Sequence, residues 1–142
     1  MDDDDKYKKI GDTINYFNRQ VMQVFKFIDS MDDYKDNELL NKVLILAKAT
    51  KAIEPAEMLE RCIDKLWDNR EAIIDKNIDF FKKPGTMHQY IKDDENKEWL
   101  TGLTDFVMDQ YDNFNDDELD EIWTRINNML KAVVEYRILT DK

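Results

Sequence analysis

The sequence predicts an all-α protein, a single-domain bundle of about five helices within residues 7–142. Along most of the chain, apolar residues recur at steps of three and four, which is the period of one helix face rather than of a strand. The 142 residues include only three Gly and two Pro, so turns are few and the elements between them are long. Apolar residues make up 42% of the chain, which suffices for one hydrophobic core at this length.

The first helix is expected at about residues 8–31. Its apolar residues keep an unbroken alternation of four-residue and three-residue steps: Ile10, Ile14, Phe17, Val21, Val24, Ile28 and Met31. Met22 and Phe25 widen this stripe, which favours a bundle core over the narrow seam of a two-stranded coiled coil. The preceding MDDDDK of residues 1–6 resembles the cleavage site of enteropeptidase. We interpret it as either a tag remnant or a disordered acidic N-terminus.

Two further helices are expected at about residues 37–49 and 55–82. The residues of the second helix that are expected to face inward are Leu39, Leu40, Val43, Leu44 and Ala47. Pro55 fits the first turn of the third helix, where its missing N–H costs no hydrogen bond. Residues 68–71 have the composition of a capping box, so a kink at this point is an alternative to one straight helix.

The last two helices are expected at about residues 94–111 and 116–139. Their apolar residues are Trp99, Leu100, Leu103, Phe106, Val107 and Tyr111, followed by Leu119, Trp123, Ile126, Leu130 and Val133. Asn115 and Glu118 have the spacing of a capping box, which marks the beginning of the final helix. Four aromatic residues fall outside the core spacings and are either buried satellites or an exposed contact patch: Phe27, Tyr34, Phe80 and Tyr90.

Residues 32–43 and 112–123 align at a constant offset of 80 residues. Each segment places an acidic residue, an aromatic residue and further acids before a Glu-Leu pair that enters a helix. A duplicated helical hairpin would produce this similarity. Two independent uses of the same capping chemistry would produce it as well.

Negative charge is concentrated in residues 93–121. This segment holds twelve Asp or Glu residues and one base, Lys97, so its net charge of −11 equals that of the whole protein. The rest of the chain holds twenty acids and twenty bases. Helix capping and the helix dipole explain some of these acids, such as Asp116 and Asp117. Solubility alone does not require the uneven distribution that remains.

Residue types for catalytic and metal sites are scarce. Ser30 and His88 are the only residues of their types. Cys62 is the only cysteine and lies among apolar residues, where thiols are usually inert. One Cys and one His cannot form a zinc cluster, and residues 112–124 lack the Gly and Glu of a calcium-binding EF-hand loop. The three glycines are isolated and form no phosphate-binding loop. We therefore expect neither an enzyme nor a metal or cofactor.

We predict a non-enzymatic protein–protein interaction module that uses an acidic face within residues 93–121 and an apolar helix surface to bind a basic protein partner. The candidate partner-binding residues are Glu98, Asp105, Asp109, Asp112, Asp116, Asp117, Glu118, Asp120 and Glu121. One alternative is an acidic nucleic-acid mimic that inhibits a DNA- or RNA-binding enzyme. Another is a structural subunit, for instance of a viral or phage particle, with homo-oligomeric contacts.

Direct binding of nucleic acid is not expected, because the clusters of Lys and Arg are short. No apolar run reaches the length of about 18 residues that a membrane span requires. The N-terminus also lacks the apolar core of a signal peptide. These features predict a soluble, cytoplasmic protein that does not bind membranes.

Overall fold

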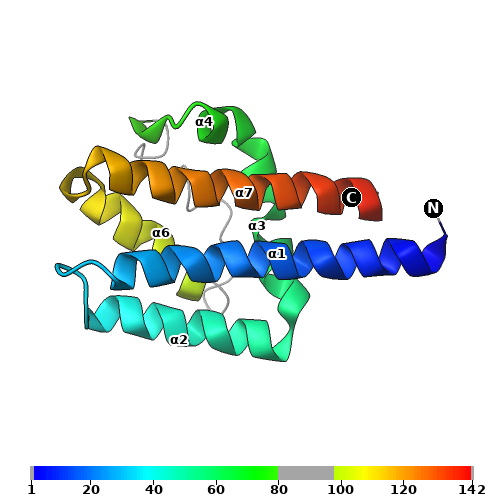
Figure 1. Cartoon of the computed structure of the whole chain (residues 1–142), viewed down its shortest axis with the longest axis horizontal. Coiled ribbons are helices and arrows are strands. Elements are labelled where there is room, and N and C mark those ends of the chain that lie inside the picture. The colour runs from blue at the N-terminus through cyan, green and yellow to red at the C-terminus, as the bar shows by residue number, and fades with distance from the viewer. Residues whose placement is uncertain (1, 80–97, 142) are drawn as a thin grey trace.

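A computed structural model of the chain describes residues 2–79 and 98–141 (Figure 1). Within these ranges the protein is all-α and contains no strand, which confirms the predicted fold class. The α-helices are α1 (Asp3–Asp29), α2 (Glu38–Ile53), α3 (Pro55–Asp68), α4 (Arg70–Ile74), α6 (Glu98–Gln110) and α7 (Asp116–Thr140), and the 3-10 helix η3 (Tyr111–Asn113) joins α6 to α7. None of the described helices is both long and apolar enough to cross a membrane.

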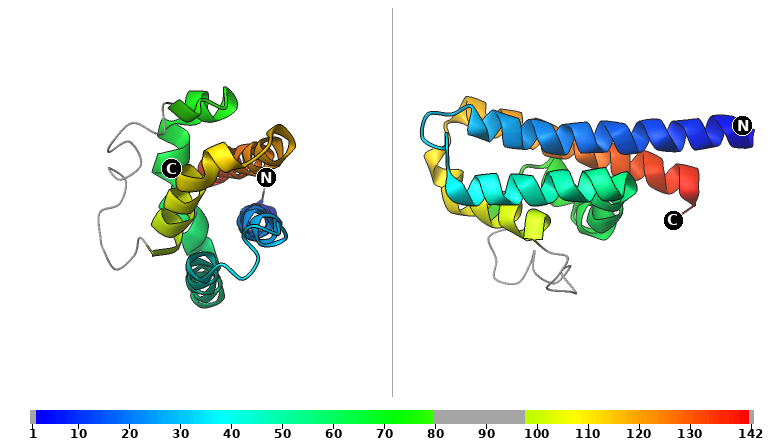
Figure 2. Two further views of the ribbon diagram at one scale, coloured as in Figure 1. Left: turned by 90° about the vertical axis from the view of Figure 1, so that its left-hand side faces the viewer. Right: turned by 90° about the horizontal axis from the view of Figure 1, so that it is seen from below.

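The two longest helices, α1 and α7, lie side by side and run in opposite directions (Figures 1 and 2). Helix α2 packs against α6, α3 and α1, and α3 crosses the long helices at a steep angle (Figure 1). The centre of the core contains side chains that are almost completely buried, because each long helix turns one apolar face inward. They include Phe17, Phe25, Ile28, Leu40, Met58, Leu59, Ile73 and Ile122.

Helix α1 begins at Asp3, earlier than the predicted start at residue 8. Asp2 caps it by accepting a hydrogen bond from the backbone N–H of Asp5 at 2.8 Å. Acidic residues in the first turn stabilise a helix through the positive end of its dipole, without any contact to the core. The prediction was wrong at this end because it followed only the apolar pattern, which begins at Ile10. The interpretation of residues 1–6 as a tag remnant stays a prediction.

The segment predicted as one helix at 55–82 divides into α3 and α4 around Asn69. The capping box expected at residues 68–71 does not form; instead the Asn69 side chain donates a hydrogen bond to the carbonyl of Lys65 at 2.8 Å. Helix α4 ends in a Schellman motif, in which Lys76 has a positive φ of 56° and the Asn77 N–H donates to the Ala72 carbonyl. Residues 80–82 of the predicted helix lie outside the described residues.

The remaining predicted boundaries need smaller corrections. Helix α2 extends to Ile53 rather than residue 49, because its backbone hydrogen bonds continue until Glu54, directly before Pro55. Helix α6 ends at Gln110 and its last turn tightens into η3, while residues 94–97 lie outside the described part. Helix α7 begins at Asp116 as predicted, with Asn115 and Glu118 bonded reciprocally at 2.8 Å.

Candidate functional site

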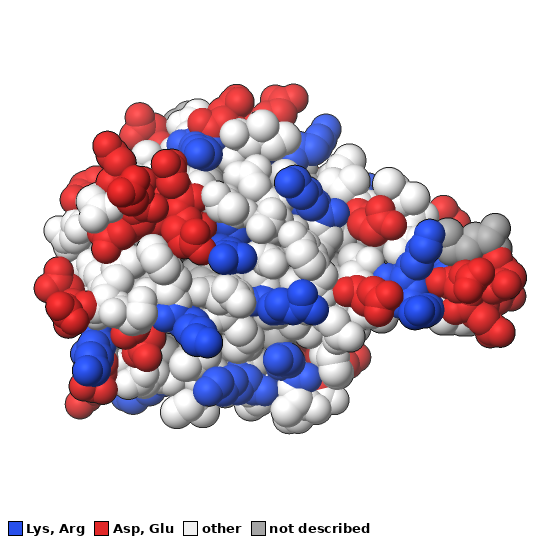
Figure 3. Space-filling model, in the orientation of Figure 1, with Lys and Arg blue, Asp and Glu red and all other residues white. Residues whose placement is uncertain are grey.

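Seven of the nine predicted partner-binding residues lie at one end of the bundle, where α6 leads through η3 into α7. Asp109 lies in the last turn of α6 and Asp112 in η3, whereas Asp116, Asp117, Glu118, Asp120 and Glu121 lie in the first two turns of α7. Figure 3 shows carboxylates gathered at this end of the molecule. Glu98 and Asp105 belong to α6, but their side chains lie outside the described part of the structure. We call the group of Asp109, Asp112, Asp116 and Asp117 the acidic end.

Buried aromatic residues hold the turn that carries the acidic end. The Tyr34 ring contacts Phe106 and Phe114, with ring centroids 5.3 and 5.5 Å apart. Its hydroxyl donates a hydrogen bond to Gln110 Oε1 at 2.9 Å. Burial raises the pKa of this hydroxyl above its ordinary value of 10.0. The loop before α2 therefore fixes the position of the turn between α6 and α7.

Glu118, Asp120 and Glu121 have structural roles in the fold. Glu118 forms the capping box, Asp120 pairs with Lys76 at 3.4 Å, and Glu121 pairs with Arg125 at 2.9 Å. Such surface pairs contribute at most about 1 kcal/mol each. The four residues of the acidic end are all exposed, so a partner can reach them directly.

The exposed apolar residues lie mainly on α2 and not at the four aromatic positions that the sequence analysis considered for a contact patch. Tyr34 is buried and Phe27 is half-buried against the core, so both are satellites of the core; Phe80 and Tyr90 lie outside the described residues. The exposed side of α2 instead carries Leu39, Ile45, Leu46 and Ile53, which are 55%, 65%, 40% and 84% exposed. The prediction that Leu39 faces inward was therefore wrong.

Catalytic chemistry finds little support in the described residues. Cys62 is buried, and burial raises the pKa of its thiol to about 12, although Lys65 and Arg61 act in the opposite direction. A thiol with this pKa is not a nucleophile at neutral pH. Ser30 caps α1 and donates a hydrogen bond to the Phe27 carbonyl at 2.6 Å. His88 lies outside the described residues. Within 2–79 and 98–141, no three His, Cys, Asp or Glu side chains converge to hold a metal ion.

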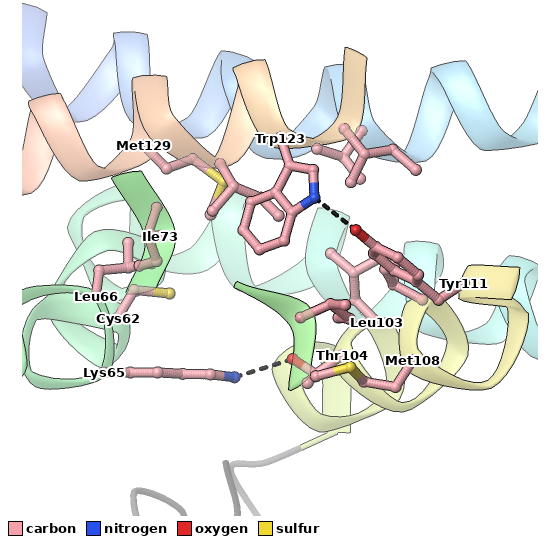
Figure 4. A pocket seen from close by; sticks show the side chains of 15 residues that line it. Cys62, Lys65, Leu66, Ile73, Leu103, Thr104, Met108, Tyr111, Trp123 and Met129 are labelled. Atoms are coloured by element: carbon pink, nitrogen blue, oxygen red, sulfur yellow. Dashed lines mark hydrogen bonds between the residues drawn. The ribbon is translucent and has the colours of Figure 1, made fainter. Parts of the chain in front are cut away.

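A cavity of about 120 Å³ lies between α3, α4, α6 and α7 (Figure 4). Most of its lining is apolar: Val24, Cys62, Leu66, Ile73, Ile78, Leu103, Val107, Met108, Ile122, Ile126 and Met129. The sequence analysis assigned several of these residues to the apolar faces of helices. The cavity between these faces could not be predicted, because it depends on how the helices pack.

Two hydrogen-bonded pairs bring polar groups to the wall of the cavity. The Lys65 ammonium donates to Thr104 Oγ1 at 2.9 Å, and Trp123 Nε1 donates to the Tyr111 hydroxyl at 2.8 Å (Figure 4). Lys65 is only 4% exposed, which is unusual for a lysine. The sequence contained no signal for this feature, because Lys65 directly follows Asp64 in an α3 sequence that alternates charged and apolar residues.

No protein family, curated protein or solved structure matches this chain. The class that the fold and the two candidate sites define is a small helical bundle with an acidic end and an apolar cavity.

Proposed function

We propose that the protein is a non-enzymatic interaction module that binds a basic surface of another protein. The observation that carries the proposal is the exposure of four carboxylates, Asp109, Asp112, Asp116 and Asp117, around a single turn. Negative charges gathered in this way repel one another, and a basic partner would relieve the repulsion.

The acidic end would act mainly on the rate and specificity of association. At physiological salt, its field extends about 8 Å into the solvent and steers a positively charged surface toward it. Leu39 lies close to this end, because Tyr34 in the loop before α2 is bonded to Gln110 at the end of α6. A partner that covers both places would gain apolar burial from Leu39, which is more than half exposed.

A homo-oligomeric structural subunit is the second candidate, and α2 favours it. Leu39, Leu46 and Ile53 follow one another at steps of seven residues on the exposed side of this helix. They form a line of one apolar residue per heptad, along which the same line of a second copy would pack. In this case the molar mass measured by sedimentation equilibrium would rise with protein concentration, and no other protein would be needed.

The experiment that tests the proposal is capture of a partner from a lysate of the source organism at low and at high salt, followed by rate measurements with the purified partner. The test variant carries Asp109→Asn, Asp112→Asn, Asp116→Asn and Asp117→Asn. A matched control changes the same number of exposed acids elsewhere: Asp12→Asn, Glu54→Gln, Asp64→Asn and Glu135→Gln.

We expect the test variant to associate about tenfold more slowly at low salt, with a weaker salt dependence, and the control to keep the rate of the natural protein. If the test variant and the control associate equally fast, the acidic end does not bind the partner. Displacement of the partner by an oligonucleotide would favour the nucleic-acid mimic instead.

A further inference from the structure

We propose that two copies of the chain pair through the outward side of α2, antiparallel and related by a two-fold axis at Ala49. This inference rests on the second candidate function, self-association through α2, and gives it a geometry. It does not depend on binding of a basic partner at the acidic end. The contact is made by exposed apolar residues in the C-terminal half of the helix, which we call the α2 strip: Ile45, Leu46, Ala49, Ala52 and Ile53.

Helix α2 has apolar residues on two sides, although only one side covers the core. Leu40, Val43 and Ala47 are buried, and Figure 1 shows α2 at one edge of the bundle. On the other side, Ile45 and Ile53 are 65% and 84% exposed. A helix that is apolar all round is normally buried on all sides. The outward side of α2 therefore has the composition of a surface that a partner covers.

The α2 strip is confined to the C-terminal half of the helix. Ile45, Ala49 and Ile53 follow one another at steps of four residues and lie on one face. Lys42 and Glu38 occupy the same face one and two turns earlier, and they interrupt it with charge. The centre of the apolar contact is therefore Ala49, midway between the two isoleucines.

A two-fold axis at Ala49 matches the α2 strip to itself, because its apolar residues are placed symmetrically about this alanine. In an antiparallel pair, Ile45 of one copy contacts Ile53 of the second copy. Leu46 contacts Ala52, so a large side chain lies against a small one. The two Ala49 residues face each other at the axis, and their small side chains let the helices approach closely.

The charges that border the α2 strip favour the antiparallel direction. Lys42 lies one turn before Ile45, and Glu54 directly follows Ile53. The antiparallel pair places each Lys42 beside Glu54 of the second copy, whereas a parallel pair would bring the two lysines together. Both side chains are exposed, and within residues 2–79 and 98–141 neither forms an ion pair. They are therefore available to a second copy.

The contact is small, which makes the dimer weak and reversible. The 16 residues of α2 span about 24 Å, and the α2 strip occupies about half of this length. Interfaces of stable complexes bury about 1,200–2,000 Å², which is more than two half-helices provide. We therefore expect a dissociation constant of about 100 µM.

Cysteine cross-linking of the full chain tests the geometry and traps a weak pair. Ala49→Cys places the two thiols at the axis and should give a disulfide-linked dimer under mild oxidation. Ala52→Cys should not link to itself, but it should link to Leu46→Cys when the two variants are mixed. The natural protein is the control, because its Cys62 is buried and cannot join two copies. A self-linked Ala52→Cys dimer, or no dimer of Ala49→Cys, refutes the proposed pairing.

Sedimentation equilibrium from about 10 µM to about 1 mM tests the contact without cysteines. Ile45→Asp places a carboxylate in the contact and should shift dimerisation to at least about tenfold higher concentration. Ile138→Asp is the matched control, because Ile138 on α7 is 66% exposed, against 65% for Ile45, and the variant adds the same charge. It should dimerise like the natural protein. Equal weakening by both variants, or a natural protein that stays monomeric, refutes the proposal.

A charge exchange tests the direction of the pair. Lys42→Glu should weaken dimerisation, and adding Glu54→Lys should restore it, because the two opposite charges then face each other again. A double variant that dimerises no better than the single one contradicts the antiparallel arrangement.

The two functional proposals fail separately. The four-residue variant of the acidic end should dimerise at least as well as the natural protein, because its substitutions lie outside the α2 strip. A chain that dimerises through α2 but shows no salt-dependent partner refutes only the acidic end. A monomeric chain that binds a basic partner refutes only the pairing of α2.

Discussion

We expect Gly102→Ala to destabilise the fold, although alanine normally stabilises a helix relative to glycine by about 1 kcal/mol. Gly102 lies in α6 where this helix packs against α2. A β-carbon at this position would come within 2.4 Å of Val43 Cγ2 and 3.3 Å of Val43 Cγ1. The first distance is far below van der Waals contact, so something in the α2–α6 interface must move.

Val43 cannot easily make room for the added methyl group. Its side chain is buried, and a valine in a helix strongly prefers one rotamer. We therefore expect the added methyl group to lower the stability by an amount at the upper end of the range for overpacking, about 2–3 kcal/mol. The higher helix propensity of alanine offsets about 1 kcal/mol of this loss. We expect a net loss of about 1–2 kcal/mol, which lowers the Tm by about 3–7 °C for a chain of this size.

Gly11→Ala provides the matched control. Gly11 also lies inside a helix, but a β-carbon there would meet no atom within 4 Å. This variant should gain about 0.5–1 kcal/mol. Urea unfolding followed by circular dichroism measures both changes, and Val43→Ala in the Gly102→Ala background should recover part of the loss. If the two glycine variants are stabilised equally, α2 and α6 do not approach as closely as the structure indicates.

Two further predictions concern the α7 cap and the buried titratable groups. Asn115→Ala removes the capping hydrogen bond to the N–H of Glu118 and should cost about 1 kcal/mol in urea unfolding, whereas Asn41→Ala on the exposed side of α2 should cost nothing. In the folded protein the pKa of Cys62, normally 9.0, and that of Tyr136, normally 10.0, are each raised to about 12, mainly by burial. Both groups keep their protons at pH values where the unfolded chain loses them. Their contribution to the free energy of unfolding is therefore complete below pH 9 and declines between about pH 9 and 12. Urea midpoints measured from pH 8 to 11 should fall less steeply for Cys62→Ala, and an equal slope would contradict the assignment.

The internal similarity between residues 32–43 and 112–123 illustrates how local chemistry appears in a sequence. Asn37 caps α2 and Asn115 caps α7. At the offset of 80 residues, however, Asn37 aligns with Asp117 and not with Asn115. The two helix caps are therefore out of register by two residues, which favours two independent uses of capping chemistry over a duplicated hairpin.

Helix identity and several helix starts could be predicted from the sequence alone, because both depend on neighbouring residues. The capping box of Asn115 and the position of Pro55 at the first turn of α3 are interactions within a few residues of the chain. The concentration of acids in residues 93–121 is likewise a property of the sequence. The pairing of Asp120 with Lys76 was not predictable, since Lys76 comes from a distant part of the chain, and the exposure of the acidic end depends on how the helices pack.

Only the tertiary structure decided which side of α2 faces the core and where the cavity lies. Helix α2 has apolar residues on both sides, so its periodicity does not distinguish the buried Leu40 and Val43 from the exposed Leu39 and Leu46. The choice is made by α6, whose Gly102 allows Val43 to approach. The cavity beside Lys65 depends on the gaps between helices that are far apart in the sequence, and these gaps are determined by how the helices pack.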